Sequence, residues 1–308
     1  MQKDVKATAE LGLTWAHTDV RSRPMNPGAA TDLVLWDDAE ELLAALEAGR
    51  REGRLGRGGQ HAFGDPSWCG RDLRGGWEAL FKAAREPWEE GLDLVERFQD
   101  ELARVELPAP LSNRRRLLWD EDEGEEYDLT RDRAGEAPWR RVQRRRLSGP
   151  QVVTVAVNPG ASCMMAPEDL AWRPAAALAL AAVLEAAGYR AEILVAHPST
   201  QSDSHGGRNL IHGVWCKRAQ DGLDLATLVN VTAPWFVRTA WFTDMNLQYG
   251  PRGASDCYGY PALLTGAAVA ALDPGCREVW VVDDALSFDD AVRVAAGFLK
   301  RLAEGRAA

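Results

Sequence analysis

The spacing of apolar residues predicts helices in the first third of the chain. Apolar side chains recur every three or four positions in 33–53, 75–86 and 88–104, as on the buried face of an amphipathic helix. Asp37 is the expected N-cap of the first of these helices. We therefore predict a helical N-terminal region over residues 1–108.

After residue 150 the pattern changes to short apolar runs that alternate with helical stretches. The runs at 152–158, 190–196, about 210–218 and 277–283 have the length of strands, and a continuous apolar run is typical of a strand covered on both faces. A helix that ends at Gly188 separates the first two runs, which predicts a right-handed parallel crossover. The second and third runs are too close for a helix between them, which predicts an antiparallel hairpin.

These connections also predict the order of the strands. The first strand should lie centrally, between the second and the last, and the third should be an antiparallel strand at a sheet edge. The expected fold class of 151–308 is α/β, a mostly parallel sheet with an antiparallel edge strand. The turn at 158–162 and Asp283 should then lie at the same edge of the sheet.

Residues 109–150 form a third part, which we predict to be a charged arm or linker. Residues 111–150 contain ten Arg and nine Asp or Glu, so an acidic tip and basic flanks can neutralise each other. Two extended segments joined by a turn are the expected structure. Nucleic-acid binding by the Arg-rich run 140–146 is an alternative, but the neighbouring acidic tract competes for its charges.

Calcium binding is a second alternative for this arm. Asp120, Asp122 and Glu123 follow one another at the tip, and carboxylates are the usual calcium ligands. The EF-hand loop needs a Gly at its sixth position and a Glu at its twelfth. Gly124 falls fifth from Asp120, so the match to that loop fails.

Composition narrows the classes of function. The formal net charge of −10 and the pI near 5.1 argue against a general nucleic-acid binder and against a protein of anionic membrane surfaces. The chain has no apolar run of about 18 residues and no apolar signal core at its start, so we expect a cytoplasmic protein. The five cysteines are scattered without a C-x-x-C pair, which favours free thiols.

Residues 152–195 resemble the von Willebrand factor A fold. A strand ends there in the polar turn NPGAS and is followed by WRPAAALALAAVLEAAGYRAEIL. This is similar to the intracellular A-type domains of the cobalt-chelatase class, in which an Ala-rich helix leads to G-x-x-x-E-I-L. The resemblance implies a von Willebrand factor A-like domain over roughly 151–308.

The resemblance also implies a degenerate metal site. The turn of the family reads D-x-S-x-S, and its Asp and hydroxyls hold a Mg²⁺. The matching residues here are Asn158, Gly160 and Ser162, so the carboxylate and one hydroxyl are missing. We expect no metal and no cofactor, and a turn that binds a partner or ligand together with Asp244 and Asp283. Residual metal binding and a purely structural turn stay open as alternatives.

The sequence contains no recognisable catalytic set. The three histidines within 197–212 are spaced more widely than the usual zinc pairs, and nothing places a base beside Cys163. The phosphate-loop motif and G-x-S-x-G are both absent. An enzyme with a site at the same sheet edge, using Asp283, Asp244 or His197, remains the alternative.

The expected function is therefore that of an interaction or assembly module that is not an enzyme. A protein partner is expected, and the resemblance implies a ring-forming ATPase of the chelatase type as one such partner. We expect neither a membrane nor nucleic acid as partner. A third hypothesis is a structural protein of a phage or mobile element.

Overall fold

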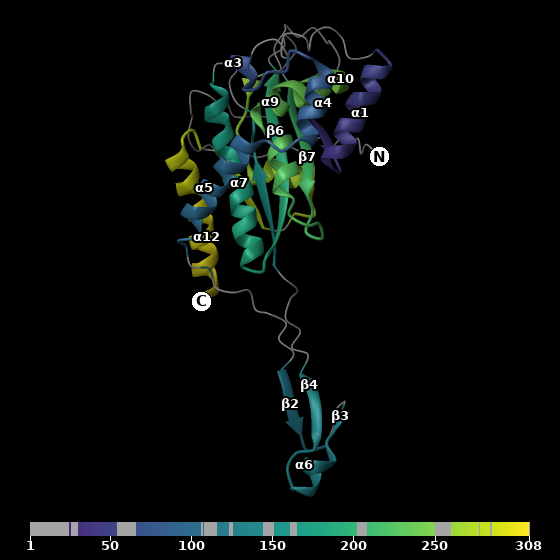
Figure 1. Cartoon of the computed structure of the whole chain (residues 1–308), viewed down its shortest axis with the longest axis vertical. Coiled ribbons are helices and arrows are strands. Elements are labelled where there is room, and N and C mark those ends of the chain that lie inside the picture. Colours follow the sequence, from purple (N-terminus) through teal and green to yellow (C-terminus); the bar gives the residue numbers. More distant parts are fainter. Residues whose placement is uncertain are drawn as a thin grey trace.

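The computed structural model describes an α/β body and a small arm that projects from it (Figure 1). The described residues are 25, 30–53, 66–105, 107, 116–122, 126–143, 151–160, 165–201, 208–249, 260–276, 278–283 and 285–307. The expected sites at Ser162 and Cys163 lie outside these ranges, as does Glu123 of the acidic tip.

A mixed sheet forms the centre of the body. Its strand order is β1-β7-β6-β5-β9, with β8 paired to β6 off this path. The strands are β1 (Thr31–Trp36), β5 (Val152–Val157), β6 (Arg190–Gln201), β7 (Arg208–Lys217), β8 (Tyr260–Pro261) and β9 (Val279–Val282). β5 pairs in parallel with β6 and β9, whereas β7 is antiparallel to β6. The central position of the first strand and the antiparallel third strand are thus confirmed.

β1 overturns two predictions. Residues 31–36, expected to lie in the helical region, form a strand that pairs in parallel with β7. The third strand is therefore not at the edge of the sheet. The helix predicted over 33–53 is shortened to α1 (Ala39–Arg51), and its N-cap is Asp38 rather than Asp37, because the Asp38 carboxylate accepts a 2.7 Å hydrogen bond from the Glu41 amide.

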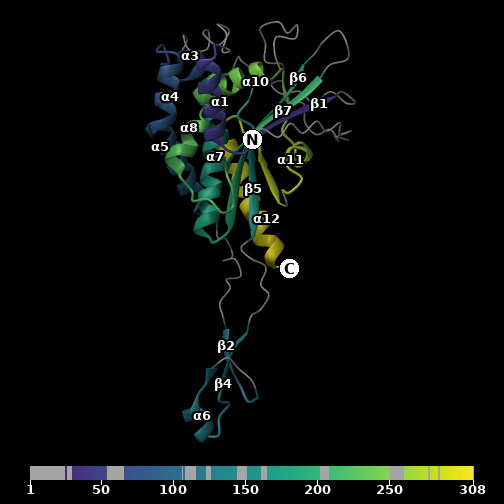
Figure 2. The ribbon, with the colours of Figure 1, turned by 90° about the vertical axis from the view of Figure 1, so that its right-hand side faces the viewer.

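Helices cover the sheet unequally. Most of the helices in the described residues pack on one face, where they share a large apolar core with β5, β6 and β7. Those on this face are α1, α3 (Pro66–Cys69), α4 (Trp77–Arg85), α5 (Glu89–Leu102), α7 (Pro167–Ala186), α8 (Leu225–Val231), α9 (Pro234–Phe236), η2 (Val237–Trp241), α10 (Phe242–Tyr249) and α12 (Phe288–Ala307). A smaller core on the opposite face includes α11 (Gly266–Leu272). Figure 2 shows α11 on one side of the sheet and α1, α4, α5 and α8 on the other.

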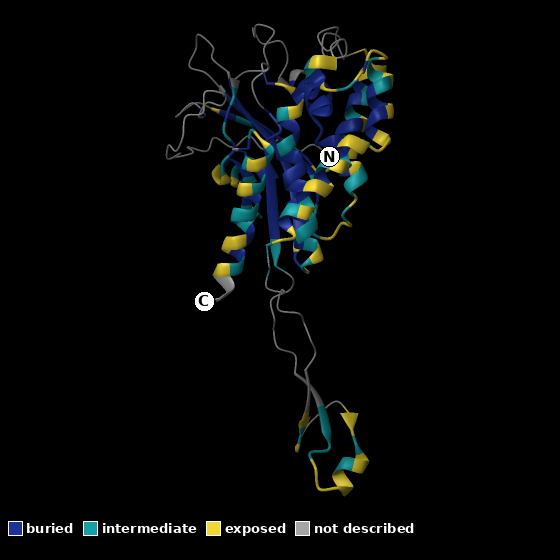
Figure 3. Ribbon diagram, turned by 60° about the vertical axis from the view of Figure 1, so that its left-hand side comes forward, coloured by how far each residue is buried: buried dark blue, intermediate teal, exposed yellow. Residues whose placement is uncertain are grey.

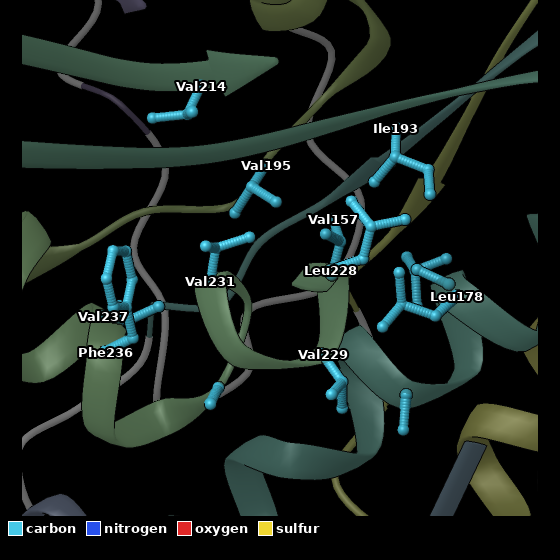
Figure 4. Packing of buried hydrophobic residues seen from close by; sticks show 14 of the residues in the cluster. Val157, Leu178, Ile193, Val195, Val214, Leu228, Val229, Val231, Phe236 and Val237 are labelled. Atoms are coloured by element: carbon cyan, nitrogen blue, oxygen red, sulfur yellow. The ribbon is translucent and has the colours of Figure 1, made fainter. Parts of the chain in front are cut away.

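The helix α7 lies at the middle of the larger core. Its sequence is apolar on all sides, which is the pattern of a buried helix. Leu178 points toward Val157 and Ile193 of the sheet, and Val229 of α8 packs nearby (Figure 4). Gly188 follows the helix with φ of 89°, a left-handed conformation that ends helices at low cost. The Ala-rich helix and its stop at Gly188 are thus confirmed.

The predicted ends of other elements were partly right. The helices expected at 75–86 and 88–104 are α4 and α5, and each is three residues shorter than predicted. β6 extends to Gln201 because β7 and β8 both pair with its second half.

The arm is a three-stranded sheet with one short helix. Its order is β2-β4-β3, formed by β2 (Arg116–Asp120), β3 (Glu126–Tyr127) and β4 (Trp139–Gln143), with α6 (Leu129–Arg133) between β3 and β4. The two outer strands pair antiparallel with β4. The expected pair of extended segments is therefore present, with a third strand and a helix added at the tip. Figures 1 and 2 show the arm well away from the body.

The N-terminal and C-terminal parts share one core. α5 packs on α7 and α12, and β1 is hydrogen-bonded to β7. Buried residues of α1, α4 and α5 belong to the same apolar cluster as those of β5 and α7. The division of the chain at 108 and 150 stays a prediction, but residues on either side of the arm fold together.

Candidate functional site

A buried polar cluster lies where β5 and β9 end. Asn158 follows β5 directly, and its backbone amide donates to the carbonyl of Val282 in β9. Its side-chain amide donates to the Ala262 carbonyl at 3.0 Å and to the Asp283 carboxylate at 3.2 Å. Asn158 and Asp283 therefore share one edge of the sheet, as predicted.

A buried ion pair completes this part of the cluster. The Nη1 of Arg173, on α7, lies 3.2 Å from Oδ1 of Asp283, and the two side chains are only 3% and 6% exposed. The guanidinium also donates to the carbonyls of Gly160 and Ala285. The second Asp283 oxygen accepts a 2.5 Å hydrogen bond from the Leu264 amide. The buried carboxylate is thus paired with one cation and also hydrogen-bonded, as a buried charge requires.

Gly160 is required by close packing in this turn. Its amide donates to Oδ1 of Asn158 at 3.0 Å, which closes the turn. A Cβ atom at this position would lie 1.6 Å from Nδ1 of His197. The absence of a side chain lets the histidine ring lie directly on the backbone, so the glycine has a structural reason independent of any ligand.

Two histidines connect this turn to a second buried pair. His197 of β6 and His212 of β7 are cross-strand neighbours. The Nδ1 of His197 lies 3.4 Å from Oδ1 of Asn158. The Nε2 of His212 lies 2.7 Å from Oδ2 of Asp244, on α10. Asp244 is thus linked to Asn158 through this histidine pair.

Trp36, the last residue of β1, contacts the His212–Asp244 pair. Its indole N–H donates to Oδ2 of Asp244 at 2.8 Å. His212 and Asp244 are both at most 1% exposed, and Trp241 packs against the His212 ring. A histidine beside a carboxylate could act as an acid–base pair, but both side chains are buried here.

The pKa of His197 follows from its surroundings. Burial, together with the charges of His212 and Arg173, lowers this pKa to about 3. His197 is therefore neutral at physiological pH and is suited to accept or donate one hydrogen bond inside the cluster. This argues for a packing role rather than for general-base catalysis near neutral pH.

The contacts and pKa values of a buried arginine and two cysteines bear on whether these are reactive or binding groups. Arg238, on η2, donates to the carbonyls of Trp68 and Met165 and lies over the Trp68 ring, so it fastens α3 to the body. Burial raises the pKa of the Cys216 thiol to about 12 and that of Cys276 to about 11, which keeps both protonated.

The metal alternatives find no support among the described side chains. No group of three or more His, Cys, Asp or Glu residues in the described ranges could hold a metal ion. At the arm tip, the Asp120 carboxylate accepts a hydrogen bond from the Asp122 amide, a local turn that any Asp can make.

Sequence reasoning missed three members of the cluster. Arg173 was visible as a lone cation in an apolar helix, and such a residue needs a buried acid. His212 was considered only as a zinc ligand, and Trp36 only as part of a helix. The role of Asn158, Gly160, Asp244 and Asp283 as partner-binding residues stays a prediction, since all four are buried here.

Fold and site together define an α/β protein with a closed polar cluster at the carboxyl edge of its sheet. The chain belongs to the family DUF7192, a domain of unknown function, whose model matches residues 22–290. That match runs through β1, the arm and the main sheet, so all three are parts of one family unit. No curated protein and no solved structure matches the chain. No helix in the described residues is long and apolar enough to cross a membrane.

Proposed function

We propose that this protein is an interaction or assembly module without catalytic activity, and that the arm is its main contact surface. The α/β body contributes a degenerate von Willebrand factor A-like domain. One observation carries the proposal: the large hydrophobic side chains that are exposed in the described residues all lie on the arm, and they are Trp119, Tyr127 and Leu129.

The exposure of these residues is substantial. Trp119 is 42%, Tyr127 46% and Leu129 52% exposed. Tryptophan and tyrosine supply much of the contact energy in protein interfaces, because they bury a large area with few rotatable bonds. Figure 3 shows the arm in yellow and teal, whereas the interior of the body is dark blue.

The arm is also held in shape before any partner binds. The guanidinium of Arg131 lies 4.2 Å from the centre of the Trp119 ring. Tyr127 contacts Trp139 edge-on, with 4.7 Å between ring centres. Glu126 and Arg140 form an ion pair across β3 and β4. Rings that are already oriented lose less conformational entropy on binding, which favours an interface.

Two observations support the likeness of the body to A-type domains. The strand order from β7 to β9 has the antiparallel third strand that this fold implies. Asn158 and Asp283 also meet at the ends of β5 and β9, where the metal turn of that family lies. A partner of the ring-ATPase type follows from the likeness alone.

The described residues of this turn, Asn158 and Gly160, do not fit a Mg²⁺ ion. Asn158 turns its nitrogen, not its oxygen, toward Asp283, and Gly160 has no side chain to offer. The Arg173 guanidinium binds the carboxylate of Asp283. We propose that Arg173 supplies internally the positive charge that a metal supplies in the family, so the turn is stable without an ion.

The test compares two arm variants in the full chain. Trp119→Ser with Leu129→Ser should lose the protein partners that wild type retains from an extract of its source cells, as measured by quantitative mass spectrometry. Arg133→Ser, an exposed polar position on α6, is the matched control and should retain them. If both variants recover the same proteins as wild type, the arm is not the contact surface.

A further inference from the structure

The helical face of the body contains a cavity that the function proposed above does not use. It has a volume of about 240 Å³ and lies between α5, α7 and α9. Its walls are mainly apolar. A cavity of this size is below the range of about 300–1,000 Å³ of most small-molecule sites, so it suits one chemical group rather than a large cofactor.

Three tryptophans line this cavity, and two of them are fixed by their neighbours. They are Trp88, Trp172 and Trp235. Trp88 packs on Gly91, where a Cβ atom would lie 2.3 Å from the indole ring. Trp172 meets Phe98 and Phe288 edge-on, with ring centres 6.4 Å and 5.9 Å away. The aromatic walls therefore exist before any ligand enters.

The charges at the cavity favour a cation. Glu90, Asp93 and Glu168 line it with exposed side chains, and Arg97 is the one basic residue among its lining residues. The guanidinium of Arg97 is stacked at 4.8 Å from the centre of the Phe288 ring. Three carboxylates against the guanidinium groups of Arg97 and of Arg71, which lies on the Trp235 ring, leave a formal charge of −1 around an aromatic cavity. An aromatic cavity with an excess of negative charge attracts alkylammonium groups.

Trp235 lies behind these walls. It is fully buried, so its indole N–H is not open to the cavity. The Arg71 guanidinium lies 4.9 Å from its ring centre. Trp88 and Trp172 are therefore the rings that a ligand in the cavity contacts.

We infer that this cavity binds an alkylammonium group. Trp88 and Trp172 contact the cation, and the carboxylates neutralise it. Two sources present this chemistry, a free small molecule such as choline and the lysine side chain of a protein. The inference does not depend on the arm, and either could be right without the other.

The experiment uses the full chain and isothermal titration calorimetry with three probes. Choline and Nα-acetyl-lysine methylamide represent the two sources, and 3,3-dimethyl-1-butanol is the neutral isostere of choline. We expect one site per chain for at least one cation, and at least tenfold weaker binding of the isostere. Choline alone would identify a small-molecule site, and the lysine derivative alone a site for a protein side chain.

Variants of the exposed carboxylates link binding to this cavity without disturbing the core. Asp93→Asn with Glu168→Gln should weaken binding of the cation at least fivefold, because two of the three negative charges are removed. Glu96→Gln is the control, since Glu96 is exposed on the same helix α5 but does not line the cavity. A second variant, Trp172→Leu, should also weaken binding.

Three results would overturn the inference. Neither cation binds, the neutral isostere binds as tightly as choline, or the double carboxylate variant binds as wild type does. Circular dichroism of each variant shows whether it is folded, and the carboxylate pair keeps the test decisive even if Trp172→Leu fails to fold.

Discussion

The polar cluster at the sheet edge and the arm differ in which side chains they expose to water. In the cluster, charged groups such as Arg173 and Asp283 are buried and find their partners inside the chain. In the arm, apolar rings such as Trp119 remain in water although they would be more stable out of it. The charged groups of the cluster are paired within the chain, whereas the apolar rings of the arm would be buried only by a second molecule.

This difference teaches where function should be sought. Sequence motifs pointed to the turn at Asn158, because polar residues after a buried strand often form a site. In the structure, these polar groups form hydrogen bonds and an ion pair with one another. No sequence motif marks the exposed aromatic residues of the arm, Trp119 and Tyr127. They are nevertheless the apolar side chains that the fold leaves in contact with water.

The largest expected effect on stability comes from removing the cation of the buried cluster, Arg173. Arg173→Met should lower the free energy of unfolding by about 3–5 kcal/mol, because it leaves Asp283 buried without its charge partner. Urea unfolding followed by tryptophan fluorescence measures it. Arg293→Met, which removes an exposed pair with Asp290, should change stability by less than about 0.5 kcal/mol. Equal effects of the two would mean that the cluster is open to solvent.

A smaller effect is expected when the turn is overfilled. Gly160→Ala should cost about 1–3 kcal/mol, since the added methyl group collides with the buried His197 ring. The double variant Gly160→Ala with His197→Ala should recover part of this loss, because the ring is no longer in the way. A double-mutant cycle by thermal unfolding measures the coupling, and purely additive effects would argue against this contact.

The pH dependence of stability tests whether the cluster around His197 is shielded from water. The pKa of His197 is about 3 in the folded protein and about 6.5 in an unfolded chain. As pH falls below 6.5 the unfolded state binds this proton first, so stability should drop by about 1.4 kcal/mol per pH unit. His197→Gln should show a flatter slope between pH 6.5 and 5. An unchanged slope would place the ring in contact with water.

The smallest expected effect concerns metal. Millimolar Mg²⁺ should not raise the melting temperature of the wild-type protein, because Arg173 binds the carboxylate that an ion would need. A ligand at a hundred times its dissociation constant would add about 2.7 kcal/mol. Differential scanning fluorimetry with and without Mg²⁺ makes the comparison, and a clear rise would contradict the internal-cation proposal.

Much of the C-terminal fold could be predicted from connection lengths. The spacing between 152–158 and 190–196 leaves room for a helix, so these strands had to be parallel, and the short link to β7 required a hairpin. The position of Asn158 beside Asp283 followed from the same argument, because parallel strands end at one edge. The rest of the candidate site could not be found in this way, since no local pattern marks the partner of a buried arginine.

The sequence by itself determined the apolar strands, the buried helix α7 and the shared edge of β5 and β9, because these depend on local periodicity and on the length of connections. Only the tertiary structure decided that residues 31–36 form a strand and that Arg173 and Trp36 enter the polar cluster. Arg173 and Asp283 are 110 residues apart in the chain, and Trp36 and Asp244 are 208 apart. Arg173 meets Asp283 only where α7 packs on the sheet and β9 pairs with β5, and Trp36 meets Asp244 only where β1 pairs with β7.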